Sequence, residues 1–156
     1  MTDAVKDPTT GAGGRTADMR LHHIGWAVAS LDAHHDHFAR QLGLPYEGVE
    51  EFATLKVSFY DAGGCLVELL EATDDGDDVA EFVARRGEGI HHLAYEVADV
   101  AEALRLAEER GLRLIDRVPR AGARGTLIGF ADAGHPDGVL VEYVELPKTD
   151  SPGDHS

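Results

Sequence analysis

The chain has 156 residues, enough for one domain with a buried core, and 43% of them are hydrophobic. Its formal net charge of −15 argues against nucleic acid or an anionic membrane surface as a partner, because both bind basic patches. A single cysteine excludes a disulfide framework, and the lack of a signal-like segment or of an apolar run that could span a bilayer predicts a cytoplasmic protein.

The two ends of the chain differ in composition from the rest. Residues 1–19 and 147–156 are rich in small and polar residues, which is typical of disordered tails. Residues 20–146 carry all the periodic apolar segments, and no linker divides them. We therefore expect one folded domain over residues 20–146.

This domain contains an internal repeat. The strand-like segment HHIGWAVAS (22–30) matches HHLAYEVAD (91–99), and each is followed by a helical segment that ends at glycine. Ser30 and Asp99 are suitable N-cap residues for these helices. Three further strand-like runs complete each copy: residues 45–52, 54–62 and 64–72 in the first, and 112–119, 126–133 and 138–146 in the second.

The repeat predicts an α+β fold of two tandem βαβββ modules, at about residues 20–73 and 88–146, joined by a linker helix over 77–87. Paired modules of this kind form a curved mixed sheet around a cleft, with the helices on the outer faces. We expect a ligand site in that cleft.

Alternation along the strands indicates which residues face the cleft. Ile24 and Trp26 lie on an apolar face suited to helix packing, which leaves His23 and Gly25 on the other face. The same alternation places Glu68, His92 and Glu142 at equivalent positions of three other strands, whereas His22 and His91 fall on the helix-facing side. Small residues beside the histidines are expected to leave space for a ligand: Gly25, Ala27 and Ala94.

The four polar residues on this face suit a divalent cation. A single strand histidine is more often an ordinary core residue, and a single glutamate can simply face solvent. Buried carboxylates, however, must be paired, protonated or bound to metal. The sequence therefore predicts a site for Co²⁺, Mn²⁺, Ni²⁺, Fe²⁺ or Zn²⁺ formed by His23, Glu68, His92 and Glu142.

Three segments carry a family resemblance: GEGIHHLAYEVADV (87–100), RGLRLIDRVPRAGARG (110–125) and GVLVEYVE (138–145). They resemble methylmalonyl-CoA epimerases, which belong to the vicinal oxygen chelate superfamily together with glyoxalase I and bleomycin resistance proteins. The resemblance extends over residues 21–146. It implies that the same four residues are metal ligands and that the protein forms a homodimer.

The resemblance also implies a reaction and a substrate. The metal would stabilise an enolate formed from methylmalonyl-CoA or a related acyl thioester, while one carboxylate removes the α-proton and a second acid returns a proton on the other face. Glu142 and Glu68 are the candidates for this catalytic role. Three arginines near a glycine-rich turn could bind the phosphates of an acyl-CoA: Arg117, Arg120 and Arg124.

Two departures from the family pattern leave other functions open. Ser58 stands where the third strand is expected to supply a second catalytic glutamate, and FADAG (130–134) replaces the usual motif before the last strand. Glu96 is an alternative second proton carrier, because it shares the face of His92. The protein could instead be an isomerase, cyclase or lyase for another carbonyl compound, for instance in secondary metabolism, or a small-molecule binding protein without catalysis.

Overall fold

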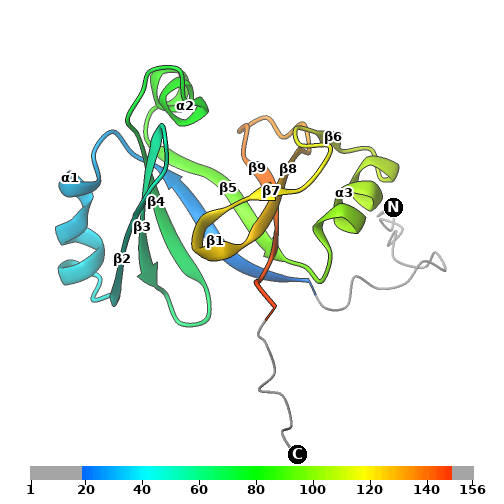
Figure 1. The fold of residues 1–156 in the computed structure, drawn as a ribbon. Helices are drawn as coiled ribbons and strands as arrows, with labels where there is room; N and C mark the ends of the chain where they lie inside the picture. Colours follow the sequence, from blue (N-terminus) through cyan, green and yellow to red (C-terminus); the bar gives the residue numbers. More distant parts are fainter. Residues whose placement is uncertain (1–18, 149–156) are drawn as a thin grey trace, which may run out of the picture.

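A computed structural model describes residues 19–148, and these form one curved mixed sheet with helices packed against it (Figure 1). The strand order is β2-β3-β4-β1-β5-β9-β8-β6, and β7 pairs with β8. The elements of the first module are β1 (Arg20–Ala27), α1 (Leu31–Asp36), β2 (Tyr46–Glu51), β3 (Leu55–Asp61) and β4 (Leu66–Ala72). α2 (Asp78–Arg86) follows, and the second module contains β5 (Gly89–Glu96), α3 (Val100–Glu109), β6 (Arg113–Leu114), β7 (Arg120–Ala121), β8 (Leu127–Asp132) and β9 (Leu140–Glu145).

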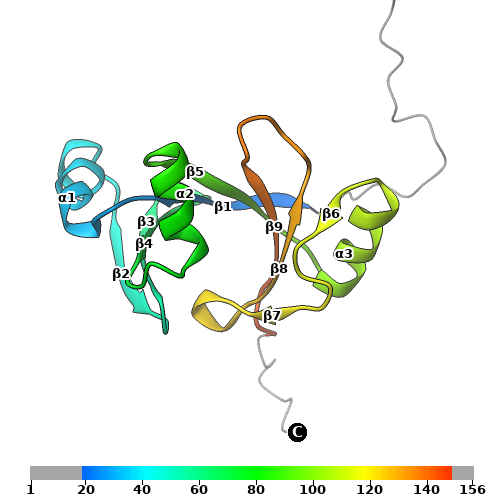
Figure 2. The same ribbon diagram turned by 90° about the horizontal axis from the view of Figure 1, so that it is seen from above.

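The two modules repeat the same strand pairing, which confirms the predicted α+β fold. β1 pairs with β4 in parallel, and β5 pairs with β9 in parallel. The antiparallel pair β1–β5 joins the modules at the centre of the sheet. Figure 2 shows α1 and α3 at opposite ends of the molecule, with α2 near the junction. This arrangement brings the first and last strands of both modules together in the middle.

The helices begin where the sequence predicts. Ser30 accepts a hydrogen bond from Ala33 N at the start of α1, and Asp99 accepts one from Glu102 N at the start of α3. The first helix is shorter than predicted, because it passes into a π-helical turn over His37–Gln41. None of the helices in residues 19–148 has the length and apolarity needed to cross a membrane.

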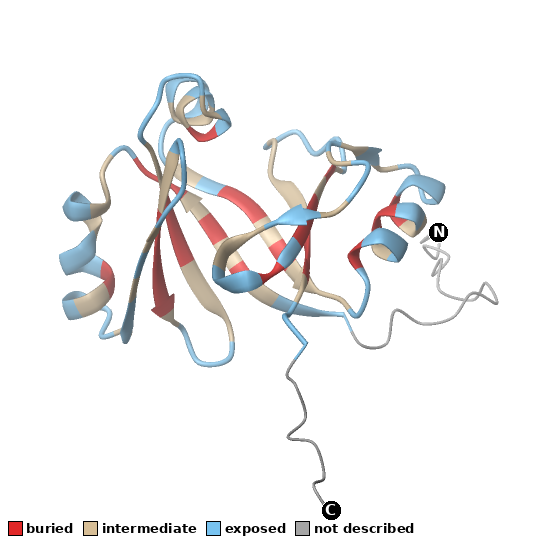
Figure 3. Cartoon of the chain, viewed as in Figure 1, coloured by how far each residue is buried: buried red, intermediate tan, exposed pale blue. Residues whose placement is uncertain are grey.

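The hydrophobic core lies on both faces of the sheet, and buried residues follow its central strands (Figure 3). Each outer helix covers one cluster: Val28, Phe38, Tyr60 and Leu69 beside α1, and Val100, Leu104, Ala107, Ala131 and Tyr143 beside α3. The concave face carries two further clusters: Ala27, Val57, Phe59, Leu70 and Val79, and Ala94, Ile128 and Val144. The apolar inner face is the wall of the predicted cleft.

The second module departs from prediction over residues 112–119, which do not form one strand. Only Arg113–Leu114 pairs with β8, and a second short piece follows at Arg120–Ala121. At Asp116 the carboxylate accepts a hydrogen bond from Phe130 N at 2.9 Å, so a side chain takes a place that a backbone carbonyl would hold in a continuous ladder. The predicted disordered tails lie outside the described residues, apart from Met19, Pro147 and Lys148.

Candidate metal centre

The four predicted ligands lie on four adjacent strands. Glu68 is on β4, His23 on β1, His92 on β5 and Glu142 on β9, which are neighbours in that order. Their exposed fractions are 6%, 4%, 3% and 4%, so all four are buried. The alternation read from the sequence therefore places them correctly on one buried region of the sheet.

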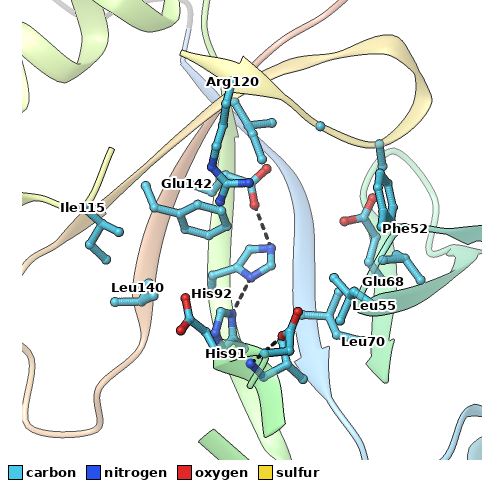
Figure 4. A pocket seen from close by; sticks show the side chains of 18 of the residues that line it. Phe52, Leu55, Glu68, Leu70, His91, His92, Ile115, Arg120, Leu140 and Glu142 are labelled. Atoms are coloured by element: carbon cyan, nitrogen blue, oxygen red, sulfur yellow. Dashed lines mark hydrogen bonds and ion pairs between the residues drawn. The ribbon is translucent and has the colours of Figure 1, made fainter. Parts of the chain in front are cut away.

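Three of the four side chains converge on one point. The Nε2 atoms of His23 and His92 are 3.0 Å apart, and Glu142 Oε2 lies 2.9 Å from His92 Nε2 and 3.5 Å from His23 Nε2. Ligand atoms of these three residues lie within 4.8 Å of one another. Glu68 contacts the group through His23, with Oε2 2.8 Å from its Nε2. Figure 4 shows Glu142 directed at the His92 ring and Glu68 on the other side of the cleft.

This donor set fits a divalent cation. Two imidazole nitrogens and a carboxylate oxygen are ordinary ligands of Zn²⁺ and its first-row neighbours. Bond lengths of about 2.1 Å to a shared ion place neighbouring ligand atoms roughly 3 Å apart. The separations of 2.9, 3.0 and 3.5 Å among Glu142, His23 and His92 are close to that spacing. Small side-chain adjustments would bring these three residues onto one ion.

Strong electrostatic coupling holds the group together. Burial lowers the pKa of His23, but hydrogen bonds from its ring to Glu142 and Glu68 outweigh burial and raise that pKa to about 9. Burial alone would raise the pKa of Glu142, yet His92 and His23 hold it well below its usual range. The carboxylates thus favour positive charge at the centre, which is what a cation site requires.

His23 and His92 are each held from behind by the histidine that precedes them in the sequence. His22 Nδ1 lies 2.8 Å from His23 Nδ1, and His91 Nδ1 lies 2.9 Å from His92 Nδ1. Burial and, to a smaller extent, the neighbouring His92 lower the pKa of His91 to about 4. Such contacts fix the orientation of a ligand ring. Side-chain alternation did not predict this role for His22 and His91. The HH pair repeated in the two modules was the sequence signal that could have indicated it.

The prediction that His91 simply faces a helix is therefore wrong in part. Its ring does pack on Phe82 of α2, with centroids 5.1 Å apart. Yet His91 also borders the cleft and touches His92. The space predicted beside Gly25 is not free either, because a Cβ there would lie 2.1 Å from His92 Cε1. Gly25 therefore makes room for the His92 ring and leaves no free space beside it.

The cleft around this centre has a volume of about 530 Å³, which is within the usual range for small-molecule sites. Its walls are mainly apolar and include Leu55, Val57, Leu70, Ile128, Phe130 and Leu140. Several of these side chains surround His92 and Glu142 in Figure 4. The charged residues that line it are Glu68, Asp77, Asp78, Asp116, Arg120 and Glu142. The cleft therefore combines an apolar wall with a polar floor.

Ser58 does not face this cleft, contrary to the sequence-based expectation. It is buried, at 3% exposure, but it lines a separate cavity on the other side of the sheet. Its neighbour Val57 lines the metal-site cleft instead, because side chains alternate along β3. The cleft-facing positions of β3 carry Leu55 and Val57, so this strand supplies no carboxylate there.

Four further candidate residues were predicted from the sequence, and one of them lines the cleft. Arg120 lines the cleft, where its guanidinium lies 5.3 Å from the centre of the Phe130 ring and its Nε donates to Asp116 at 3.1 Å. Arg124 lies over the Phe59 ring at 4.0 Å, and Arg117 pairs with Glu108 at 3.4 Å. Glu96 does not line the cleft, and its carboxylate pairs with the exposed Arg20 at 2.8 Å.

Fold and site together define a member of a known superfamily. Residues 22–130 match the model of the Glyoxalase/Bleomycin resistance protein/Dioxygenase superfamily, and the chain belongs to it. Within that superfamily it resembles methylmalonyl-CoA epimerases, as its motifs predicted.

Three relatives illustrate this similarity. The uncharacterized protein YqjC of Bacillus subtilis is 37% identical over 87% of this chain and 98% of its own length. The ethylmalonyl-CoA/methylmalonyl-CoA epimerase of Cereibacter sphaeroides is 30% identical over 81% of this chain and 98% of its own. A variant of Streptomyces coelicolor methylmalonyl-CoA epimerase, solved in complex with 2-nitronate-propionyl-CoA, superposes with a TM-score of 0.73 at 31% identity, covering 85% of this chain and 98% of that one.

Proposed function

We propose that this protein is a metal-dependent epimerase or isomerase that acts through an enolate on methylmalonyl-CoA or a related acyl thioester. The observation that carries the proposal is the convergence of His23, His92 and Glu142 in a buried cleft. The identity to the Cereibacter and Streptomyces epimerases supports the reaction type and the acyl-CoA class of substrate. The metal, as one of Co²⁺, Mn²⁺, Ni²⁺, Fe²⁺ or Zn²⁺, is part of the same proposal.

His23, His92 and Glu142 would hold the cation, with Glu68 beside His23 as a fourth ligand. A bound divalent cation supplies Lewis acidity that stabilises negative charge on the substrate's thioester and carboxylate oxygens. The contacts of His22 and His91 keep the two ligand rings oriented. The apolar walls exclude water and strengthen these electrostatic interactions.

The carboxylates of Glu68 and Glu142 are the proposed proton carriers. One takes the α-proton, the electron pair of that C–H bond moves onto the thioester oxygen as the enolate forms, and a proton returned to the opposite face inverts the carbon. His92 and His23 keep the pKa of Glu142 low despite its burial, and a low pKa suits a ligand better than a base. Glu68 contacts only His23 of the three convergent residues, so we assign the proton removal to Glu68 first.

Arg120 is the cleft's cationic side chain and the proposed contact for an anionic group of the substrate. Its partner Asp116 also accepts the hydrogen bond from Phe130 N, and it directs the guanidinium through the contact with Arg120 Nε. Arg117 and Arg124 are engaged elsewhere with Glu108 and Glu47. A homodimer and a cytoplasmic location remain part of the proposal; sedimentation and cell fractionation test them.

Deuterium exchange at the α-carbon tests the reaction directly. Protein loaded with each candidate cation is incubated with methylmalonyl-CoA in D₂O, and mass spectrometry follows the label. We expect exchange that depends on the cation and is lost in His92→Ala. Absence of exchange with every cation would exclude methylmalonyl-CoA as a substrate.

A second function on the same site has its own support. β3 presents Leu55 and Val57 to the cleft and no acid, so a reaction that needs only one proton carrier fits as well. An isomerase, cyclase or lyase for another carbonyl compound would bind the cation and leave methylmalonyl-CoA unlabelled. A non-catalytic binding protein would show no tight cation binding at all, so cation titration separates it from both enzymes.

A further inference from the structure

A second cavity lies on the face of the sheet opposite the metal centre. Its volume is about 350 Å³, at the lower end for small-molecule sites. Alternate residues of β3 form its floor: Lys56, Ser58 and Tyr60. Strands β2 and β4 supply its sides, and α1 borders it with Leu31, Asp32 and His35. None of the residues of this cavity lines the metal-site cleft.

An unpartnered hydroxyl points to a ligand here. Ser58 is 3% exposed, and its Oγ has no hydrogen-bond partner among the described residues. Buried polar groups in folded proteins nearly always have a partner, because leaving one unpaired costs stability. Since Ser58 borders the cavity, a molecule bound there could supply the missing hydrogen bond.

One end of this cavity is aromatic. The ring of His35 lies 4.8 Å from that of Tyr46 and 5.9 Å from that of Tyr60, and the two tyrosine rings are 5.4 Å apart. His35 Nδ1 and the Tyr60 hydroxyl are 2.8 Å apart, which fixes the deeper ring. Tyr46 is 47% exposed and is available to a ligand. Such rings attract flat apolar groups and cations.

The other end is acidic. In the strand register Lys56 stands directly between Glu51 and Glu71, and its Nζ is 3.6 Å from Glu51 Oε1. Asp32 of α1 also lines the cavity, so the lining contains three carboxylates and one ammonium group. Lys56 can satisfy only part of this negative charge. A second positive group is therefore favoured beside Glu71.

From these three features we infer that the cavity is a separate binding site for a small organic ammonium ion that carries a flat apolar part. The amine lies beside Glu71, the flat part lies against the exposed ring of Tyr46, and Ser58 forms a hydrogen bond to a polar atom of the ligand. This inference does not depend on the proposed enzymatic function, because it uses no residue of the metal-site cleft.

Titration with tyramine tests the site in the full-length protein, with binding followed by the backbone amide resonances of β3 and β4. We expect saturable shifts centred on Ser58, Tyr60 and Glu71. The matched anion 3-(4-hydroxyphenyl)propionate has a similar shape and should not bind. Glu71→Gln and Tyr46→Ala should each weaken tyramine binding about two- to fivefold. Glu81→Gln, an exposed change on α2, should leave it unaltered.

Three results would overturn the inference. Equal binding of the anion would remove the charge argument, and shifts confined to the metal-site cleft would place the ligand elsewhere. Absence of saturable binding would mean that water or a second copy of the chain fills the cavity. Loss of affinity in Ser58→Ala with an unchanged fold, checked by circular dichroism, would support the hydrogen bond to the ligand.

Discussion

The Nε2 atoms of His23 and His92 lie 3.0 Å apart although 69 residues separate them in sequence. The antiparallel pairing of β1 with β5 produces this contact, because it places Gly25 opposite His92 and Ala94 opposite His23. Each module supplies one histidine and one glutamate. The candidate metal centre therefore exists only when both modules are folded and paired.

Removing a single ligand should abolish tight cation binding. We expect His92→Ala and Glu142→Ala to weaken divalent-cation binding by more than the roughly 10- to 100-fold typical of a lost outer-shell contact. Metal analysis after dialysis and calorimetric titration measure this. His37→Ala is the control, because His37 is an exposed helix residue that contacts Gln41. Unchanged binding in both ligand variants would disprove the metal centre.

The proposed role of Glu68 as a proton carrier can be tested against Glu96 by two glutamate changes. Glu68→Gln should lower α-proton exchange by about 10²–10⁴, because Glu68 lies at the centre. Glu96→Gln should change exchange less than about twofold, because Glu96 pairs with Arg20 and does not line the cleft. Exchange rates by mass spectrometry, with cation content measured in parallel, distinguish loss of a base from loss of metal. The reverse ranking would reinstate Glu96.

Gly25 should tolerate no side chain. A Cβ at Gly25 would meet the His92 ring at 2.1 Å, so Gly25→Ala should displace that ligand, weaken cation binding and destabilise the fold by about 1–3 kcal/mol. Gly89→Ala on the partner strand is the matched control, because a Cβ there meets no atom within 4 Å. Urea unfolding and cation titration of both variants provide the measurement. Equal stability and equal cation binding of the two variants would show that the His92 ring can move aside without destabilising the protein.

The cation-free protein should lose stability at alkaline pH. The pKa of His23 rises from 6.5 to about 9 on folding, because Glu142 and Glu68 outweigh the effect of burial. A raised pKa stabilises the fold fully below pH 6.5, and this contribution is lost as pH rises through about 9. We expect a decrease of about 3 kcal/mol between these limits.

Urea unfolding of chelator-treated protein at pH 6.5 and 9.5 measures this decrease. His23→Gln should show little of it, because the titrating group is gone. A saturating divalent cation should suppress the dependence, since a ligand imidazole must be neutral. A cation-free wild type that is equally stable at both pH values would refute the assignment to His23.

Removal of two buried hydroxyl groups, one at a time, should have different effects on stability. Ser58 Oγ has no partner, so Ser58→Ala should leave stability unchanged or raise it by up to about 1 kcal/mol. Thr126 Oγ1 donates to Ala123 O at 2.7 Å, so Thr126→Val should cost about 1 kcal/mol. Thermal unfolding of both variants without added ligand makes the comparison. A large loss in Ser58→Ala would mean that ordered water satisfies this hydroxyl.

Much of the site could be predicted because it depends on local rules. The repeat of HH strands and of apolar strands with a central glutamate determined the two βαβββ modules. Side-chain alternation then sufficed to select His23, Glu68, His92 and Glu142, since all four share one face. Helix starts at Ser30 and Asp99 were equally local, because a cap depends on the residues of a single turn.

The tertiary structure decided the contacts that depend on strand register and side-chain packing. A shift of one residue moves a strand side chain to the other face, so sequence matching placed Ser58 in the cleft where the structure has Val57. The pairing of Glu96 with Arg20 and the filling of the space at Gly25 by His92 join residues far apart in the chain. Alternation fixes a face, but only packed strands determine which atoms meet on it.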